Sequence, residues 1–242
     1  MVAIVALWGD DHPDLGRIRD ERLDERTALA LSRGRFPKPY AHVDPNEDAV
    51  LAACGSGGWL LAVADGHFGF DAARAALGAV EARGDALVGA PLRRPEMELR
   101  ELCAAAQDAV VKALEHAVEP RTGSRTALTV ALATDADLHV VTYGDTVCVR
   151  ARGGRGKVVG RGHAFLGPGT VVPPVTRARL RPRDRVAVAS DGLTDYLGHD
   201  WTHRIAGVLC GSHDPQVAAR HLVELAGAGG AGDNVAVAVR LS

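Results

Sequence analysis

The segment that decides the fold is Leu61-Ala62-Val63-Ala64-Asp65-Gly66-His67, in which an apolar run ends on an acidic residue, a glycine and a histidine. Residues 59–64 have the length and apolar content of a buried β-strand. Asp65 therefore stands where the strand ends, with its carboxylate projecting from the sheet edge. Because Gly66 has no side chain, backbone or a bound ion can approach this carboxylate closely.

Three further aspartates stand next to a glycine at the end or the start of a predicted strand. They occur in Tyr143-Gly144-Asp145, Ser190-Asp191-Gly192 and Gly232-Asp233-Asn234. Carboxylates that meet at one point repel one another and raise each other's pKa unless a cation neutralises them. A convergent set therefore predicts a hard divalent cation with oxygen ligands, Mg²⁺ or Mn²⁺ rather than zinc. The alternative is that each Asp-Gly pair forms an ordinary turn.

Apolar patterns along the rest of the chain predict an α+β fold. Strands are expected at residues 2–7, 49–53, 59–64, 126–133, 138–143, 147–151, 186–189 and 235–239. Helices are expected at residues 14–31, 71–83, 95–118, 201–209 and 215–226. Runs of strands alternate with runs of helices, which favours antiparallel sheets covered by helices over strict βαβ units.

Composition excludes several classes of function. The 242 residues carry 28 Lys+Arg against 30 Asp+Glu, a formal net charge of −2, and 47% are hydrophobic. This length and apolar content suit one domain over residues 1–242. The balanced charge argues against nucleic acid and membrane surfaces as partners. The four cysteines form no C-x-x-C pair and the sequence carries no targeting or membrane-spanning pattern, so a cytoplasmic protein is expected.

Six short segments follow one another in a fixed order. They are Asn46-Glu47-Asp48-Ala49, the 61–67 segment, Ser124-Arg125-Thr126-Ala127, and residues 141–146, 188–195 and 232–237. In this order and spacing they resemble the metal-dependent protein serine/threonine phosphatases of the type-2C (PPM) family, in its bacterial single-domain form. The resemblance covers residues 40–242 and leaves residues 1–35 as an N-terminal extension without a counterpart. It implies a four-layer α-β-β-α sandwich of two antiparallel sheets flanked by helices.

The resemblance also implies a site for two Mn²⁺ or Mg²⁺ ions, with a third that is weak or absent. Asp65 is expected to bridge the two ions, with the carbonyl of Gly66 on the second. The other expected ligands are Asp191 and Asp233 on the first ion, Glu47 and Asp48 on the second, mostly through water, and Asp195 near the third. Two such ions lower the pKa of a bridging water, and the resulting hydroxide is expected to attack phosphorus. His67 is the candidate general acid for the serine or threonine alkoxide.

The sequence departs from the family pattern at the phosphate-binding position. Where the family usually has an arginine, three residues before Asn46, this chain has Val43. Candidate substrate-binding residues are His42, Arg35 and Lys38, together with Asn234. No acidic residue occurs between Asp145 and Asp184, so the family's flap segment is expected to be short and the third metal site incomplete.

The expected activity is hydrolysis of phosphoserine or phosphothreonine by a monomer whose substrate is a phosphorylated protein, a kinase or its target. One alternative is a phosphoprotein-binding regulatory module with weak or no catalysis. Another keeps the catalysis but changes the substrate, to a regulator such as an anti-sigma antagonist or to a small phosphate ester. The sequence leaves these open because specificity lies in irregular loops.

Overall fold

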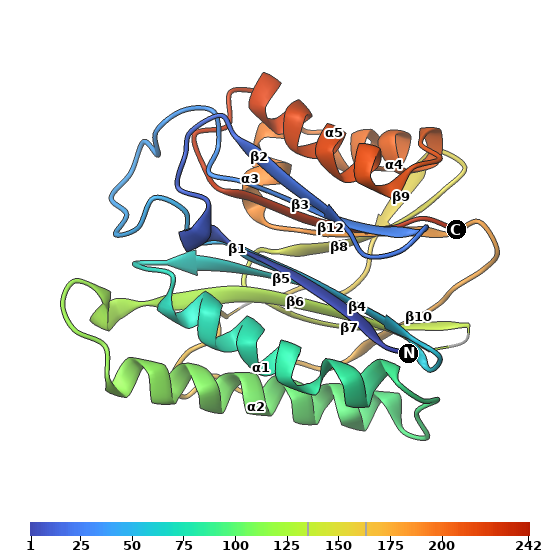
Figure 1. Cartoon of the computed structure of the whole chain (residues 1–242), viewed down its shortest axis with the longest axis horizontal. Coiled ribbons are helices and arrows are strands. Elements are labelled where there is room, and N and C mark those ends of the chain that lie inside the picture. Colours follow the sequence, from blue (N-terminus) through green and yellow to red (C-terminus); the bar gives the residue numbers. More distant parts are fainter. Residues whose placement is uncertain (135, 163) are drawn as a thin grey trace.

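The computed structural model describes residues 1–134, 136–162 and 164–242. Within them the chain forms two six-stranded sheets, and every strand pairing is antiparallel (Figure 1). The first sheet has the order β1 (Ala3–Trp8), β4 (Ala49–Gly55), β5 (Gly58–His67), β6 (Arg125–Thr134), β7 (Asp137–Tyr143) and β10 (Thr176–Arg179). The second has the order β2 (Ile18–Arg22), β3 (Thr27–Ser32), β12 (Val235–Arg240), β11 (Arg185–Ala189), β8 (Val147–Arg152) and β9 (Arg155–Val158).

Helices cover the outer face of each sheet (Figure 1). On the first sheet lie α1 (Asp71–Val88) and α2 (Pro95–Glu115), and on the second lie α3 (Asp191–Leu197), α4 (Trp201–Gly211) and α5 (Pro215–Ala228). The predicted α+β sandwich of two antiparallel sheets flanked by helices is therefore confirmed. Among the described residues, no helix has the length and apolarity that crossing a membrane requires.

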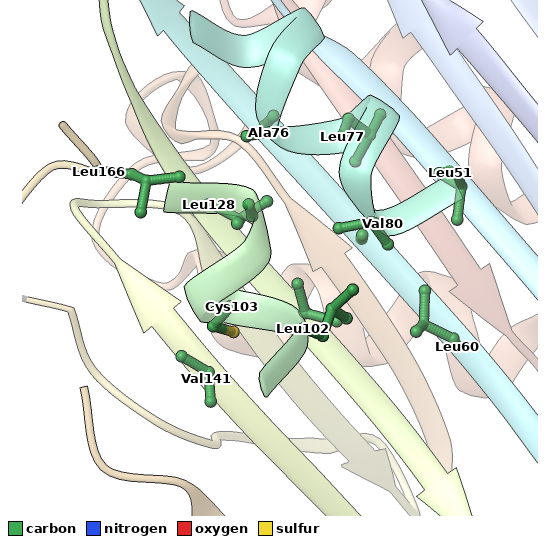
Figure 2. Close-up of a cluster of buried hydrophobic side chains, with 14 of the residues drawn as sticks. Leu51, Leu60, Ala76, Leu77, Val80, Leu102, Cys103, Leu128, Val141 and Leu166 are labelled. Carbon is green, nitrogen blue, oxygen red and sulfur yellow. The ribbon is translucent and has the colours of Figure 1, made fainter. Parts of the chain in front are cut away.

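Strand β5 shows how the layers arise, because its side chains alternate between two buried faces. Leu60 packs beneath α1 and α2, where Figure 2 places it beside side chains of both helices. Leu61 and Val63 instead pack between the two sheets. A strand that is apolar on both faces is fixed in register, since a shift by one residue exchanges its faces. Asp65 and His67 continue the face of Leu61 and Val63, toward the space between the sheets.

The helix predicted at residues 14–31 is wrong, because the structure has the hairpin of β2 and β3 there. All six residues of β3 are buried, with Ala28 and Ala30 beneath α5 and Leu29 and Leu31 between the sheets. This strand is apolar on both faces and shows no alternation of apolar and polar residues. The prediction of a helix at residues 14–31 therefore depended on the charged residues that precede the strand. The N-terminal extension is thus part of the sandwich, with β1 in one sheet and β2 and β3 in the other.

The apolar pattern does not predict three short elements, β9, β10 and α3, although arginine alternates along residues 177–185, as is typical of an exposed edge strand. Strands β9 and β10 have four residues each and lie at the sheet edges, where only one neighbouring strand pairs with them. Their residues are polar and partly exposed, so they lack the apolar alternation that identifies a strand. Helix α3 begins at Asp191 and has only seven residues, which is too short for a helical period to stand out.

Candidate functional site

The strand-end carboxylates converge at the end of the sandwich opposite the two chain termini (Figure 1). The register explains this convergence. In the first sheet the end of β5 lies beside the start of β4, with Ala64 opposite Ala49. In the second sheet the end of β11 lies beside the start of β12, with Ala189 opposite Val237. The acidic residues lie at or next to these four strand ends. In the first sheet Asp65 is in the last three residues of β5, and Glu47 and Asp48 directly precede β4. In the second sheet Asp191 begins α3 after β11, and Asp233 lies two residues before β12.

Burial and mutual repulsion dominate the electrostatics of this cluster. Asp65 and Asp48 are buried, and neither Oδ2 atom has a hydrogen-bond partner among the described residues. Burial, followed by the charges of Asp48 and Asp191, raises the pKa of Asp65 well above its usual range. Burial and Asp233 likewise raise the pKa of Asp48 well above its usual range and that of Asp191 to about 7. Carboxylates that are buried and unpaired in this way fit a divalent cation with oxygen ligands.

His67 and Asp145 lie close to Asp65. Atoms of these three side chains that could bind a metal ion all lie within 4.8 Å of one another, and His67 Nε2 is 3.7 Å from Asp65 Oδ1. Burial lowers the pKa of His67, which favours the neutral imidazole that can bind a metal. The predicted ligand set omits Asp145, although the Gly144-Asp145 turn carries the same strand-end signal as the residues that it includes.

Asp195 and Gly66 also lie close to residues of the cluster. Asp195 is one helical turn after Asp191 in α3, and burial and Asp233 raise its pKa. Gly66 packs so closely that a Cβ atom there would lie 2.5 Å from the carbonyl oxygen of Glu47. Only glycine fits this approach, which brings the backbone of β5 against the loop that carries Glu47.

Glu47 and Asn234 hold the loops of the site together. Glu47 Oε1 accepts hydrogen bonds from the backbone N–H groups of Val43, Asp44 and Gly69. The Oδ1 atom of Asn234 accepts a hydrogen bond from the N–H of Glu47, and its Nδ2 donates to two backbone carbonyls, those of Arg33 and Pro45. The amide of Asn234 is therefore engaged with the protein itself, which supports a structural role rather than contact with a substrate.

Lys38 is the predicted cation that reaches the carboxylates. Its Nζ atom lies 3.0 Å from Glu47 Oε2 and 3.5 Å from Asp233 Oδ1, and the side chain is only 5% exposed. Burial by itself lowers the pKa of Lys38, but Glu47, Asp233 and Asp48 together raise it above its ordinary value. The hydroxyl of Tyr40 donates a hydrogen bond to the other oxygen of Asp233. An ammonium group thus lies directly inside the cluster.

Arg35 and His42 do not join this cluster in the described part of the chain. Arg35 is exposed and His42 is half-buried. The guanidinium of Arg35 lies 5.9 Å from the ring centroid of Phe36, and His42 Nδ1 lies 3.1 Å from the carbonyl oxygen of Tyr40. Of the three side chains considered for phosphate binding, the structure brings Lys38 into the site and leaves Arg35 and His42 outside the cluster.

Comparison with known proteins bears on the family and the fold of this chain. The sequence profile described as Protein phosphatase 2C matches residues 40–225. Curated proteins give no match to the sequence. Among solved structures, the catalytic domain of the serine threonine protein phosphatase PstP in complex with two manganese ions is 23% identical, with a TM-score of 0.71, covering 100% of this chain and 99% of that chain.

Two further structures are similar over most of the chain. The Mycobacterium tuberculosis serine/threonine phosphatase PstP/Ppp is 25% identical with a TM-score of 0.72, covering 93% of this chain and 99% of that one. The PPM Ser-Thr phosphatase MsPP from Mycobacterium smegmatis, in complex with cacodylate, is 29% identical with a TM-score of 0.67, covering 88% and 97%. Since the profile spans more than half of the sequence and includes the segments of Glu47, Asp65 and Asp191, this chain belongs to the protein phosphatase 2C family.

Proposed function

We propose that this protein is a phosphomonoesterase that depends on Mn²⁺ or Mg²⁺ and hydrolyses phosphoserine and phosphothreonine in proteins. The observation that carries the proposal is the buried carboxylate cluster around Asp65, in which the Oδ2 atoms of Asp65 and Asp48 have no hydrogen-bond partner among the described residues. Family membership supports it, because members of this family are generally serine/threonine protein phosphatases. The two manganese ions in the PstP complex support the choice of metal.

The residues proposed to hold the ions are the carboxylates of Asp65, Asp48, Asp191 and Asp233 and the carbonyl of Gly66. Asp145 and Asp195 are proposed to bind a third ion more weakly. Glu47 is proposed to position the loops of the site through the backbone hydrogen bonds that it accepts. When bound, divalent cations activate water and stabilise negative charge on phosphoryl oxygens. The chain's own contribution is a rigid, largely buried set of acceptors, which costs no reorganisation when the substrate arrives.

The deciding experiment compares turnover with binding. Metal-stripped protein is supplied with Mn²⁺ and either p-nitrophenyl phosphate or a phosphoserine peptide, and released phosphate is measured. The proposal predicts multiple turnovers that EDTA and Asp191→Ala both abolish. Binding of the phosphopeptide without release of phosphate supports the regulatory-module alternative instead. Turnover that Asp191→Ala leaves undiminished contradicts the proposed metal site.

His67 is proposed as the proton donor to the leaving oxygen. A general acid matters most when the leaving group is a poor one, so the serine alkoxide needs the proton far more than p-nitrophenolate does. We expect His67→Ala to lower kcat on a phosphoserine peptide roughly 100-fold and kcat on p-nitrophenyl phosphate by less than about tenfold. Because burial lowers the pKa of His67, the protonated fraction, and with it kcat on the peptide, should increase as the pH falls toward that pKa. An equal loss on both substrates contradicts the assignment and places His67 with Asp65 and Asp145 as a donor to metal.

Lys38 is expected to oppose metal binding, because its ammonium group already neutralises Glu47 and Asp233. Replacing Lys38 with Met removes a positive charge beside the site and should tighten Mn²⁺ binding about tenfold or more, measured by calorimetry. The same change should lower the melting temperature of the metal-free protein, since it leaves buried carboxylates without a partner. Unchanged or weaker Mn²⁺ binding contradicts this expectation.

Chemical labelling offers a second readout for Lys38 that does not depend on activity. The chain has three lysines, and the other two, Lys112 and Lys157, are exposed and serve as internal controls. In the metal-free protein Lys38 should react with an amine reagent much more slowly than the controls, because its side chain is 5% exposed. Labelling at the rate of the controls in the metal-free state contradicts the buried ion pair.

A further inference from the structure

Arg125 lies at the rim of the carboxylate cluster, on the same face of the first sheet as Asp65 and His67. It opens β6, where it pairs with His67 in the antiparallel ladder, and two residues on Ala127 pairs with Asp65. Directly opposite residues of an antiparallel pair project to the same side, and so do residues two apart on one strand. The side chain of Arg125 therefore stands on the face where the candidate metal ligands gather.

Two aromatic rings flank the Arg125 guanidinium. Its central carbon lies 4.7 Å from the ring centroid of Phe165 and 5.6 Å from that of Phe68. The Phe165 ring in turn meets the His67 ring edge to face, with centroids 4.7 Å apart. Contact with aromatic rings orients a guanidinium through its flat face and leaves its N–H groups at the edge available. A chain of contacts thus links Arg125 to the side chains of the site.

Backbone hydrogen bonds hold Phe165 in this position. On one side the N–H of Gly144 donates to the carbonyl of Ala164 at 2.8 Å. On the other side the N–H of Leu166 donates to the carbonyl of Thr126 at 2.7 Å. The loop is therefore attached both to the turn that carries Asp145 and to β6 itself, so the ring that contacts Arg125 is a fixed part of the site.

Phe68, the second ring beside Arg125, has a strained backbone. Its φ angle is +59°, a conformation that a bulky side chain rarely adopts, and the residue is 46% exposed. The next residue, Gly69, donates its N–H to Glu47 Oε1 at 2.6 Å, and its carbonyl accepts the hydroxyl of Ser124 at 2.9 Å. Strain of this kind persists where the surroundings impose it, and it concentrates at functional sites. Here it presents an aromatic ring beside Arg125 and the carboxylates.

We propose that Arg125 is a binding residue for the phosphoryl oxygens of the substrate, an inference that rests on the proposed phosphatase function. The side chain is exposed, and no carboxylate of the described residues lies within 4.0 Å of its nitrogens. A flat guanidinium with free N–H edges is the side chain best suited to hold two oxygens of a phosphate at once. Arg125 thus supplies positive charge from the rim, while the carboxylates hold the cations.

The test compares Arg125→Ala, Arg125→Lys and the control Arg93→Ala, which removes an exposed arginine from the connection between α1 and α2. All are loaded with Mn²⁺ and assayed with p-nitrophenyl phosphate, with a phosphoserine peptide lacking acidic residues, and with inorganic phosphate as inhibitor. For Arg125→Ala we expect KM for both substrates and the inhibition constant of phosphate to rise roughly 10- to 100-fold. We also expect kcat to change by less than about threefold and Mn²⁺ affinity to stay the same. Arg125→Lys should restore only part of the loss, because it keeps the charge but not the planar fork.

An inhibition constant of phosphate for Arg125→Ala within about twofold of the wild-type value overturns the proposal. Failure of the proposed function is a separate outcome, seen as no Mn²⁺-dependent turnover by the wild type. In that case calorimetry of inorganic phosphate binding to the Mn²⁺-loaded proteins decides. Weaker binding by Arg125→Ala upholds the assignment, whereas equal binding, or no binding by the wild type, overturns it.

Discussion

Asp65→Asn is expected to lower kcat/KM for a phosphoserine peptide in Mn²⁺ about 10³-fold or more, because the carboxylate proposed to hold both ions becomes a neutral amide. The same change should stabilise the metal-free protein. Asp65 is buried close to Asp48 and Asp191, and its Oδ2 has no partner in the described part of the chain. Removing one of these repelling charges should add about 1–2 kcal/mol to the free energy of unfolding.

Two measurements check this prediction, peptide turnover and the melting temperature with and without Mn²⁺. In the wild type Mn²⁺ should raise the melting temperature strongly, since it binds the folded state only. In Asp65→Asn the metal-free value should be higher than in the wild type and the shift on adding Mn²⁺ much smaller. The control is Asp108→Asn, an exposed aspartate on α2, which should alter neither quantity. Activity within tenfold of the wild-type value, or a lower metal-free melting temperature, contradicts the account.

Glu47→Ala should destabilise the protein more than any other single change in the site. Its Oε1 atom accepts three backbone N–H bonds from two loops, and its Oε2 pairs with the buried Lys38. Without it, three backbone N–H donors lose their acceptor, and the buried ammonium group keeps only the more distant Asp233 as a partner. Breaking a buried ion pair from one side costs about 3–5 kcal/mol, which in a protein of this size lowers the melting temperature by roughly 10 °C or more.

Glu47→Gln separates the two contributions of this side chain. Glutamine retains an acceptor for the backbone N–H groups but loses the charge that faces Lys38, so an intermediate loss of stability is expected. Chemical denaturation of the metal-free proteins measures both changes, with Glu115→Ala at the exposed end of α2 as the control. A loss below about 1 kcal/mol for Glu47→Ala contradicts the view that this residue holds the loops of the site.

The positions of the carboxylates could be predicted from the sequence because local signals mark them. An apolar run followed by Asp and Gly places Asp65 at a strand end whatever the rest of the chain does, and the same holds for Asp191. Their convergence follows from the antiparallel register. Asp145 also lies beside a glycine at the end of a predicted strand, so the same pattern could have placed it among the predicted metal ligands.

The position of the lysine side chain in the site could not be predicted from the sequence in the same way. Lys38 lies in the loop Pro37-Lys38-Pro39, where no periodicity fixes the direction of a side chain. Its contact with Glu47 and Asp233 depends on how the loop closes over the completed sandwich. The prediction of a helix where β3 lies was wrong for a related reason. A strand that is buried on both faces has no alternation of apolar and polar residues, so only its neighbouring strands identify it.

The most direct test of the central claim is a titration of metal-stripped wild-type protein with Mn²⁺, in which phosphate release from a phosphoserine peptide is followed. The account predicts negligible release without metal, a rate that rises and saturates as the carboxylate cluster fills, and reversal by EDTA. A rate that is the same with and without Mn²⁺ would contradict the account, and so would no release at any Mn²⁺ concentration while calorimetry shows the ions bound.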